Sequence, residues 1–85
     1  MDIQIGKVTH YYDKLGVAVV EVKNQPLKVA DQVKISGHDQ EFTQVISSLQ
    51  VEHEHVKEVG PGETCGLKVD KPVREGDILY LVRTR

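Results

Sequence analysis

Short runs of apolar residues, separated by turn-forming residues, make up most of this chain. Toward the C-terminal end, Cys65, Leu67 and Val69 alternate with a glycine and a lysine. A period of two places these three apolar side chains on one face of a strand. Residues 78–82 are a continuous apolar run of strand length, which is typical of a strand buried on both faces. The pattern therefore predicts two strands here, joined by a charged connection.

The N-terminal residues predict a hairpin. Residues 3–12 change their apolar parity at Gly6, which indicates a bulge or a bend within one strand. Residues 13–16 have the composition of a turn, and residues 17–22 follow as an apolar strand. The Asn-Gln-Pro stretch at residues 24–26 ends that strand, because proline cannot donate to a ladder of hydrogen bonds.

Turn chemistry separates the later strands as well. Val33 and Ile35 alternate with polar residues, and a turn is expected after them at residues 36–39. Another turn is expected at Gly-Pro-Gly, residues 60–62, where proline presets the first central φ and glycine supplies a positive φ at the second. These residue types favour a turn over a ligand cradle.

Residues 41–51 fit two patterns. The helical spacing i, i+3, i+4, i+7 is met by Phe42, Val45, Ile46 and Leu49. The same stretch is rich in β-branched residues, which favour a strand. The pattern by itself leaves a strand and a short helix open. Residues 52–59 alternate polar with apolar residues and predict a continuing strand or extended chain.

Composition favours the all-β class. The 85 residues suffice for one domain, residues 1–85, with a modest core. Trp is absent and aromatic residues are few, so the core must be built from Val, Ile and Leu. Valine-rich runs broken by Gly, Asn and Asp are typical of a β-barrel or a sandwich.

The net charge of −2 does not indicate nucleic-acid binding by the chain as a whole. The charge is uneven, since residues 39–63 hold six acids and one base while the remainder holds ten bases and seven acids. These segments could form an acidic and a mildly basic region, or their charges could intersperse.

The cellular compartment is suggested by a single cysteine. Cys65 has no partner for an internal disulfide, which fits a reducing compartment. The first residues lack the apolar region of a signal peptide, and no run is long enough to span a membrane. We expect a soluble cytoplasmic protein.

Five stretches occur in order along nearly the whole chain: IGKV at residues 5–8, VADQVKI at 29–35, VISSLQ at 45–50, GETCGL at 62–67 and GDIL at 76–79. Together they resemble the β-barrel that forms the second domain of translational GTPases such as elongation factor Tu. The chain is also similar to the C-terminal appendage of the collagenase-like peptidase family, some of whose members take part in tRNA uridine hydroxylation. The resemblance implies a small all-β fold, a six- to seven-stranded closed or nearly closed β-barrel, with residues 42–51 as strand.

Two positions depart from the translation-factor pattern. Ala30 stands where the family usually has glycine. Gln50 stands where an acidic residue of elongation factor Tu helps to form the pocket for the aminoacylated adenosine, whereas the basic residue of the first strand is kept as Lys7. The resemblance therefore does not carry over an aminoacyl pocket.

Motifs for catalysis are weak. No G-x-x-x-x-G-K-[ST] motif is present, so we expect no GTPase domain and no GTP binding. His53 and His55 are candidate metal ligands, because positions i and i+2 of a strand face the same way. No spacing singles out a third ligand from His10, His38, Glu52 and Glu54. An exposed polar strand explains the histidines equally well, and we expect no metal and no cofactor.

Cys65 is the candidate nucleophile. It could be activated by a nearby histidine. Its place in the apolar alternation favours a buried small residue instead, since free cysteine is among the most buried residue types. We expect the chain not to be an enzyme.

A candidate nucleic-acid site combines cationic and aromatic residues. The rings at residues 10–12 could stack on unpaired bases, or could cover the end of a small barrel. The bases at residues 68–74 could contact phosphates, or could belong to a solvated loop. Residues 39–63 should face elsewhere, because carboxylates repel phosphates. The predicted site consists of Lys7, Tyr11, Tyr12, Lys68, Lys71 and Arg74.

The sequence leaves three functions open. The favoured one is a non-catalytic binding module that contacts tRNA, ribosomal RNA or a protein of translation or tRNA metabolism, which rests partly on analogy. The alternative is a protein-interaction subunit that completes a larger enzyme in trans. An independent metal or thiol enzyme would rest on His53, His55 and Cys65 alone. RNA binding should fall steeply with salt, whereas an apolar protein contact should not.

Overall fold

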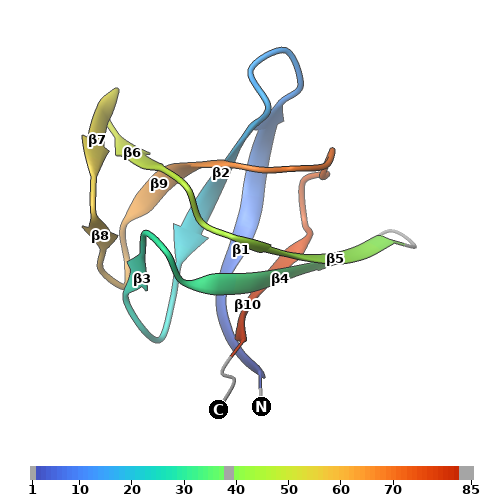
Figure 1. The fold of residues 1–85 in the computed structure, drawn as a ribbon, viewed down its shortest axis with the longest axis horizontal. Helices are drawn as coiled ribbons and strands as arrows, with labels where there is room; N and C mark the ends of the chain where they lie inside the picture. The colour runs from blue at the N-terminus through green and yellow to red at the C-terminus, as the bar shows by residue number, and fades with distance from the viewer. Residues whose placement is uncertain (1, 38–39, 83–85) are drawn as a thin grey trace.

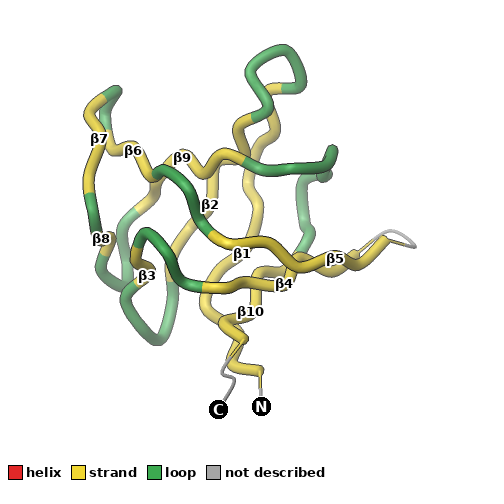
Figure 2. The backbone as a smooth tube through the Cα atoms, in the orientation of Figure 1, coloured by secondary structure: helices red, strands yellow, loops and turns green. Residues whose placement is uncertain are grey.

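Ten strands and no helix lie within residues 2–37 and 40–82, the part of the chain that the computed structural model describes (Figure 1). Loops and turns join the strands throughout (Figure 2). The all-β prediction is confirmed. The strands are β1 (Asp2–Tyr12), β2 (Val17–Val22), β3 (Leu27–Lys28), β4 (Gln32–Gly37), β5 (Gln40–Val45), β6 (Leu49–Val51), β7 (Glu54–Val56), β8 (Glu58–Val59), β9 (Thr64–Lys68) and β10 (Ile78–Val82).

Eight of these strands form one sheet in the order β5-β4-β10-β1-β2-β9-β6-β7, while β3 and β8 pair separately. All of the pairs are antiparallel. β1 and β2 form the predicted hairpin. The two C-terminal strands do not pair with each other, because β10 lies between β4 and β1 while β9 lies between β2 and β6.

The sheet curls strongly between β5 and β6. These strands follow one another in the chain but are well separated in the strand order, and only residues 46–48 connect them. A link of this length spans at most about 14 Å. Ile46 fixes the link, since its N–H donates to the Asp31 carbonyl and its carbonyl accepts from the Ala30 N–H, both at 2.9 Å. The strands therefore wrap around a common interior, as Figure 1 shows.

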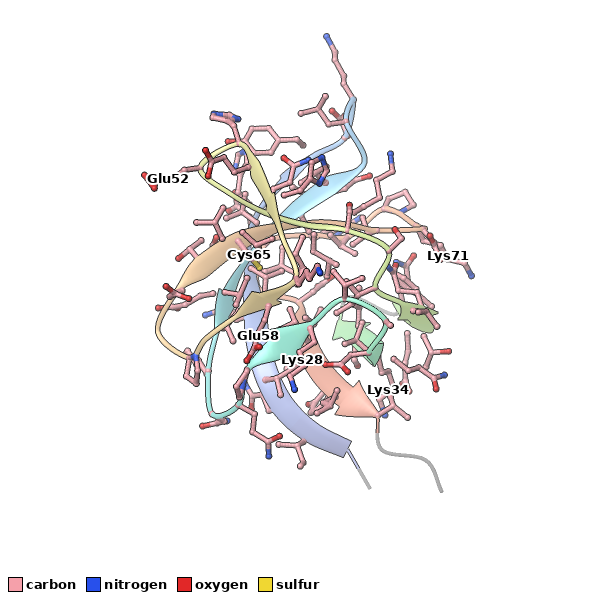
Figure 3. All side chains as sticks on the ribbon, turned by 60° about the vertical axis from the view of Figure 1, so that its left-hand side comes forward. Lys28, Lys34, Glu52, Glu58, Cys65 and Lys71 are labelled. Carbon is pink, nitrogen blue, oxygen red and sulfur yellow. The ribbon has the colours of Figure 1, made fainter. Side chains whose placement is uncertain are left out.

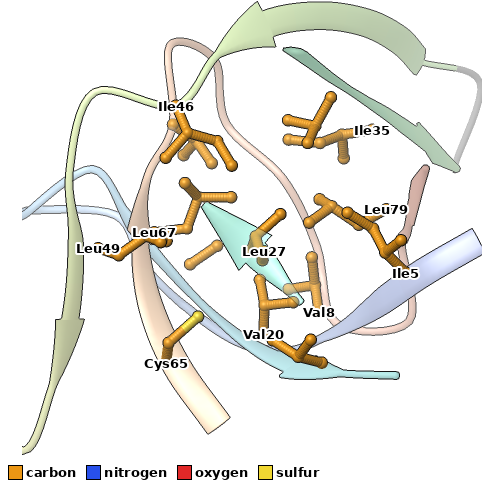
Figure 4. Packing of buried hydrophobic residues seen from close by; sticks show 14 of the residues in the cluster. Ile5, Val8, Val20, Leu27, Ile35, Ile46, Leu49, Cys65, Leu67 and Leu79 are labelled. Carbon is orange, nitrogen blue, oxygen red and sulfur yellow. The ribbon is translucent and has the colours of Figure 1, made fainter. Parts of the chain in front are cut away.

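The core fills that interior with aliphatic side chains (Figure 4). Alternation works as predicted in β2, where Ala18, Val20 and Val22 are all buried. It also works in β9 and the residue after it, where Cys65, Leu67 and Val69 are buried. The remaining buried apolar residues are Ile5, Val8, Leu27, Val33, Ile35, Phe42, Ile46, Leu49, Val59, Val73 and Leu79.

Bulges and turns also lie where the sequence places them. The pairing of β1 with β10 shifts between Gln4 and Gly6, and its pairing with β2 shifts again between Val8 and His10. In the turn after β1, the N–H of Gly16 donates to the Tyr12 carbonyl at 2.9 Å. At the Gly-Pro-Gly turn the glycine of residue 62 has φ of +89°, as expected.

Residues 41–51 form strand rather than helix, as the resemblance implied, but residues 46–48 interrupt it. Residues 52–59 are not one continuous strand, so that expectation is wrong. Glu52 and His53 form a two-residue turn, with φ of +52° and +68°, and β7 folds back on β6. Breaks of this kind explain why ten strands are found instead of six to seven. The predicted turn at residues 36–39 lies partly outside the described residues.

β10 differs from its sequence pattern. Leu79 is fully buried, but its neighbours Ile78 and Tyr80 are only half-buried. The expectation of burial on both faces is therefore wrong, because the outer face of β10 carries no covering layer among the described residues. Tyr80 is covered only in part, by the Lys34 ammonium group 5.4 Å from its ring centre.

Candidate functional site

Outward-facing residues of β1, β2, β9 and β6 form rows across the sheet. In one row, Val17 pairs with Tyr12 on one side and with Lys68 on the other. These positions alternate with core positions of the same strands, so they share the outer face. The next row consists of Val19, Gly66 and Gln50.

Two adjoining depressions, of about 300 and about 380 Å³, lie over these rows. Leu15, Val17, Gln50 and Gly66 line both depressions. We call their combination the outer hollow. It is lined by Tyr12, Leu15, Val17, Val19, Gln50 and Gly66.

The floor of the outer hollow depends on Gly66. A Cβ atom at this position would lie 3.2 Å from Cγ1 of Val17 and 3.9 Å from the Gln50 carbonyl oxygen. The glycine thus leaves a gap between two strands that any side chain would begin to fill. The walls are apolar and open to solvent, since 48% of Tyr12 and 63% of Leu15 is exposed.

The rim of the outer hollow is polar and carries both signs of charge. Lys68 lies at one end, and its Nζ is 3.4 Å from the Leu15 carbonyl oxygen, to which it donates. Glu52 and His53, the turn between β6 and β7, lie at the other end. Figure 3 shows Glu52 at the outer end of this hairpin, away from Cys65.

The structure brings only two residues of the predicted nucleic-acid site together. Tyr12 and Lys68 flank Val17 on the outer face. Tyr11 does not join them, because it is partly buried and packs against the core. Lys7 lies further along β1, where it pairs with Glu21.

The other two predicted bases lie on the connection between β9 and β10. Lys71 stands over the ring of Phe42, with Nζ 5.7 Å from the ring centre. The Arg74 backbone N–H donates to the carboxylate of buried Asp77 at 3.0 Å, beside a separate small depression. Lys71 and Glu52 lie on opposite sides of the view in Figure 3. The predicted site is therefore spread over several surfaces.

The acidic segment does not face away from the aromatic residues as expected. Glu52 shares the outer hollow with Tyr12, so that expectation is wrong. Glu41 pairs with Lys34 at 3.4 Å, and Glu58 lies elsewhere, in a depression that Lys28 also lines. Two described acids of this segment, Glu41 and Glu58, thus lie beside bases, because the curled sheet distributes the segment over several faces.

His10 is held by two neighbours. Its Nδ1 lies 3.2 Å from the Glu75 carboxylate, and its ring meets the Tyr12 ring edge-on at a centroid distance of 4.4 Å. The His10 ring therefore contacts the tyrosine that lines the outer hollow. Of residues 10–12, Tyr11 is the one that packs against the core.

Cys65 belongs to the core, as the alternation predicted. It is 2% exposed, and burial, together with the negative charge of Glu63, raises the pKa of its thiol to about 11. The thiol is therefore protonated at neutral pH, and a thiolate is the form that attacks electrophiles.

The two histidines considered as metal ligands do not lie side by side on one strand. His53 is in the turn, whereas His55 is in β7 and pairs with Gln50. Both are exposed. Within residues 2–37 and 40–82, no three metal-binding side chains of His, Cys, Asp or Glu converge.

Comparison with known proteins identifies the family. The sequence matches the family described as Peptidase family U32 C-terminal domain over residues 3–79. The chain belongs to this family. The U32 C-terminal domain accounts for the resemblance to the collagenase-like appendage. The resemblance to the translation-factor barrel stays a prediction.

Two relatives are much longer than the matched domain. A protein of Methanocaldococcus jannaschii named as an uncharacterized protease is 37% identical over 82 residues, which are 95% of this chain and 20% of that protein. A protein of Porphyromonas gingivalis named as a collagenase is 29% identical over 79 residues, 92% of this chain and 19% of that protein. The chain thus spans about a fifth of the length of these relatives.

A solved structure has the same fold. The C-terminal domain of a Geobacillus thermoleovorans U32 peptidase superposes with a TM-score of 0.87 at 24% identity, covering 95% of this chain and 93% of that one. At this identity the likeness shows the fold alone. In the described part of the chain, no helix is long and apolar enough to cross a membrane.

The outer hollow was missed in the sequence. Its signal was present in β2, where Val17 and Val19 make the outward parity apolar as well as the inward one. What the pattern lacks is the identity of the neighbouring strands, which bring Gly66 and Gln50 opposite these valines.

Proposed function

We propose that this U32 C-terminal domain is a non-catalytic binding module that contacts a protein and completes a larger enzyme in trans. The observation that carries the proposal is the family match over residues 3–79, because the matched domain makes up about a fifth of relatives named as a protease and a collagenase. The chemistry of such an enzyme would then reside in the other four fifths.

The residues support a binding role. The one thiol is buried and protonated, and His53 and His55 lie on different elements. By contrast, the outer hollow offers exposed apolar walls with a polar rim, the usual character of an interaction surface.

The test uses the M. jannaschii relative with its matching fifth deleted. We expect this truncated protein to bind our chain in a 1:1 complex, measured by calorimetry and size-exclusion chromatography. The intact relative is the control, because its own domain should already occupy the contact. Equal binding by both proteins, or none by either at about 100 μM, where even a weak complex should form, contradicts the proposal.

RNA is a second candidate partner, favoured by the adjacency of Tyr12 and Lys68. An aromatic ring beside a cation can stack a base and hold a phosphate. tRNA or ribosomal RNA would be the ligand, with Lys7, Lys71 and Arg74 as further contacts. Charge reversal of Lys68, Lys71 and Arg74 to Glu should then abolish salt-sensitive tRNA binding. Lack of tRNA affinity at low salt in the unaltered chain would exclude it.

We also infer that the sheet is a closed barrel in which β5 and β6 act as one bent strand. The link through Ile46 supports this closure, as does the Gln44 amide, which donates to the Lys68 carbonyl and accepts from the Asp70 N–H. On this proposal residues 1–85 work as one domain. The lone cysteine favours the cytoplasm as its compartment.

A further inference from the structure

We propose that the outer hollow is the docking site for the protein partner, and that it accepts one apolar or aromatic side chain flanked by charges of both signs. The inference rests on the proposed function and specifies its surface. The occupant is a protein segment rather than a nucleic acid.

Exposed apolar residues cluster at the outer hollow. In the described part of the chain, four large apolar residues have more than a third of their surface exposed, namely Tyr12, Leu15, Val29 and Val45. The two of these on the β1–β2 hairpin line the same depression. Clustered exposed apolar groups with a polar rim mark interaction sites, and tyrosine is enriched at their centres.

The shape suits an inserted side chain. The floor lacks a side chain at Gly66, and the walls are the flanking valines and the ring of Tyr12. Volumes of about 300 and about 380 Å³ are at the small end of the range for ligand sites. A phenylalanine or leucine side chain could lie over the glycine and contact both Val17 and Val19.

The charges decide the chemistry of the occupant. Lys68 and Glu52 stand at opposite ends of the outer hollow. The Glu52 carboxylate makes no ion pair with any of the described residues. A polyanion would gain from the lysine but be repelled by the glutamate. A protein segment with a carboxylate near Lys68 and a cation near Glu52 complements both ends.

The test is a titration of the full isotope-labelled chain, followed by NMR. The probe is the peptide Ac-Gly-Glu-Phe-Lys-Gly-NH2, and the control peptide has Gly in place of Phe. We expect the probe to shift the amides of Leu15, Val17 and Gly66 in a saturable way at about 1–10 mM, the range for a single-side-chain contact. The control peptide should leave these amides unchanged. Absence of saturable shifts there, or equal shifts with the control peptide, overturns the proposal.

Matched variants test the residues. Leu15→Ser should weaken probe binding at least about fivefold, since it removes an apolar wall. Val45→Ser, at a similarly exposed valine outside the outer hollow, should leave binding unchanged. Glu52→Gln should weaken binding of the probe less than Leu15→Ser does, because it removes one screened charge. Equal affinities for the leucine and valine variants would overturn the assignment.

The same variants separate this inference from the proposed function. If the truncated M. jannaschii relative binds the unaltered chain and Leu15→Ser equally well, the binding module stands but the outer hollow is not its contact. If the peptide binds as expected and the truncated relative does not, the outer hollow is confirmed as a binding site. The proposal that the domain completes a larger enzyme in trans is then contradicted. If octauridylate shifts the same amides as the probe does, the assignment to a protein is overturned in favour of RNA.

Discussion

Among the described residues, four other than glycine adopt a positive φ, and Ala30 is one of them. Its φ is +80°, and its N–H donates to the Ile46 carbonyl at the link between β5 and β6. Glycine would adopt this positive φ without strain. An L-residue with a side chain is strained in this conformation.

We expect Ala30→Gly to stabilise the fold by about 0.5–1 kcal/mol. Relief of left-handed strain is worth about 1–2 kcal/mol, and the greater freedom of glycine in the unfolded chain offsets part of it. Urea denaturation measures the change. Ala18→Gly, at a buried position of β2, is the control and should destabilise the fold. A destabilised Ala30→Gly variant would show that the turn is not strained.

Cys65 gives a second prediction at this scale. In the folded chain its pKa is raised from 9.0 to about 11, chiefly by burial. The folded state therefore holds the thiol proton more tightly than the unfolded state does. The contribution of this thiol to the free energy of unfolding is complete below pH 9. It should be lost as the pH rises from 9 toward 11, because the unfolded chain then gives up the thiol proton first.

At pH 8 the native thiol should react with Ellman's reagent at least about 100 times more slowly than in guanidinium chloride, because the reactive thiolate is both scarce and covered. Cys65→Val should fold and should lose the component of the pH dependence that the thiol contributes. A native reaction as fast as that of the unfolded chain would show that the thiol is accessible.

At the scale of elements, the β6–β7 hairpin contains two residues that its turn disfavours. A two-residue turn with both φ values positive is best formed by Asn-Gly, whereas this chain has Glu52 and His53. The double variant Glu52→Asn, His53→Gly should raise stability by about 1–2 kcal/mol, since each strained residue costs about 1 kcal/mol or more.

Thermal unfolding measures that gain. Because Glu52 also contributes charge to the outer hollow, the double variant should bind the Phe-containing peptide more weakly than the unaltered chain does. Loss of stability in the double variant would mean that the native side chains support the hairpin by contacts of their own.

Gln44 fastens β5 to the end of β9. It is 5% exposed, and its amide group donates to the Lys68 carbonyl and accepts from the Asp70 N–H, both at 2.8 Å. Gln44→Leu should cost about 2–3 kcal/mol, because two backbone groups lose their partner in a part-buried setting. Gln40→Leu is the matched control on the same strand.

The control residue also donates to a backbone carbonyl, that of Pro72, but it is exposed and water can replace it. Gln40→Leu should therefore lower the free energy of unfolding by less than about 1 kcal/mol. Chemical denaturation compares the two variants. Equal costs would show that the link made by Gln44 is not part of what holds β5 in place.

At the scale of the whole molecule, we expect the curvature of the sheet to depend on Gly6. A Cβ at this bulge would lie 2.7 Å from Cγ1 of Val20 and 3.0 Å from the Glu21 carbonyl oxygen. Gly6→Ala should therefore cost about 1–3 kcal/mol, because the backbone of β2 must move away. Gly60→Ala is the control, since a Cβ there meets only a side-chain oxygen of Glu63 at 3.6 Å. If urea denaturation shows no loss of stability in Gly6→Ala, the bulge accommodates a Cβ atom without a shift of β2.

The sequence by itself determined the local features of this protein. A period of two is a property of consecutive residues, so the buried faces of β2 and β9 could be predicted without knowing their neighbours. The bulge at Gly6 and the turn at residues 60–62 follow from the backbone freedom of glycine and the fixed φ of proline. The family resemblance came from the same local stretches in order.

Only the tertiary structure decided which residues meet. Strand pairing joins Tyr12, Val17 and Lys68 into one row, although they are far apart in the chain. Curling of the sheet separated Lys71 and Arg74 from that row and placed Glu52 beside Tyr12. Which residues become neighbours depends on strand register and sheet curvature. Both are set by the burial of the whole core, so no periodic pattern within one segment reveals them.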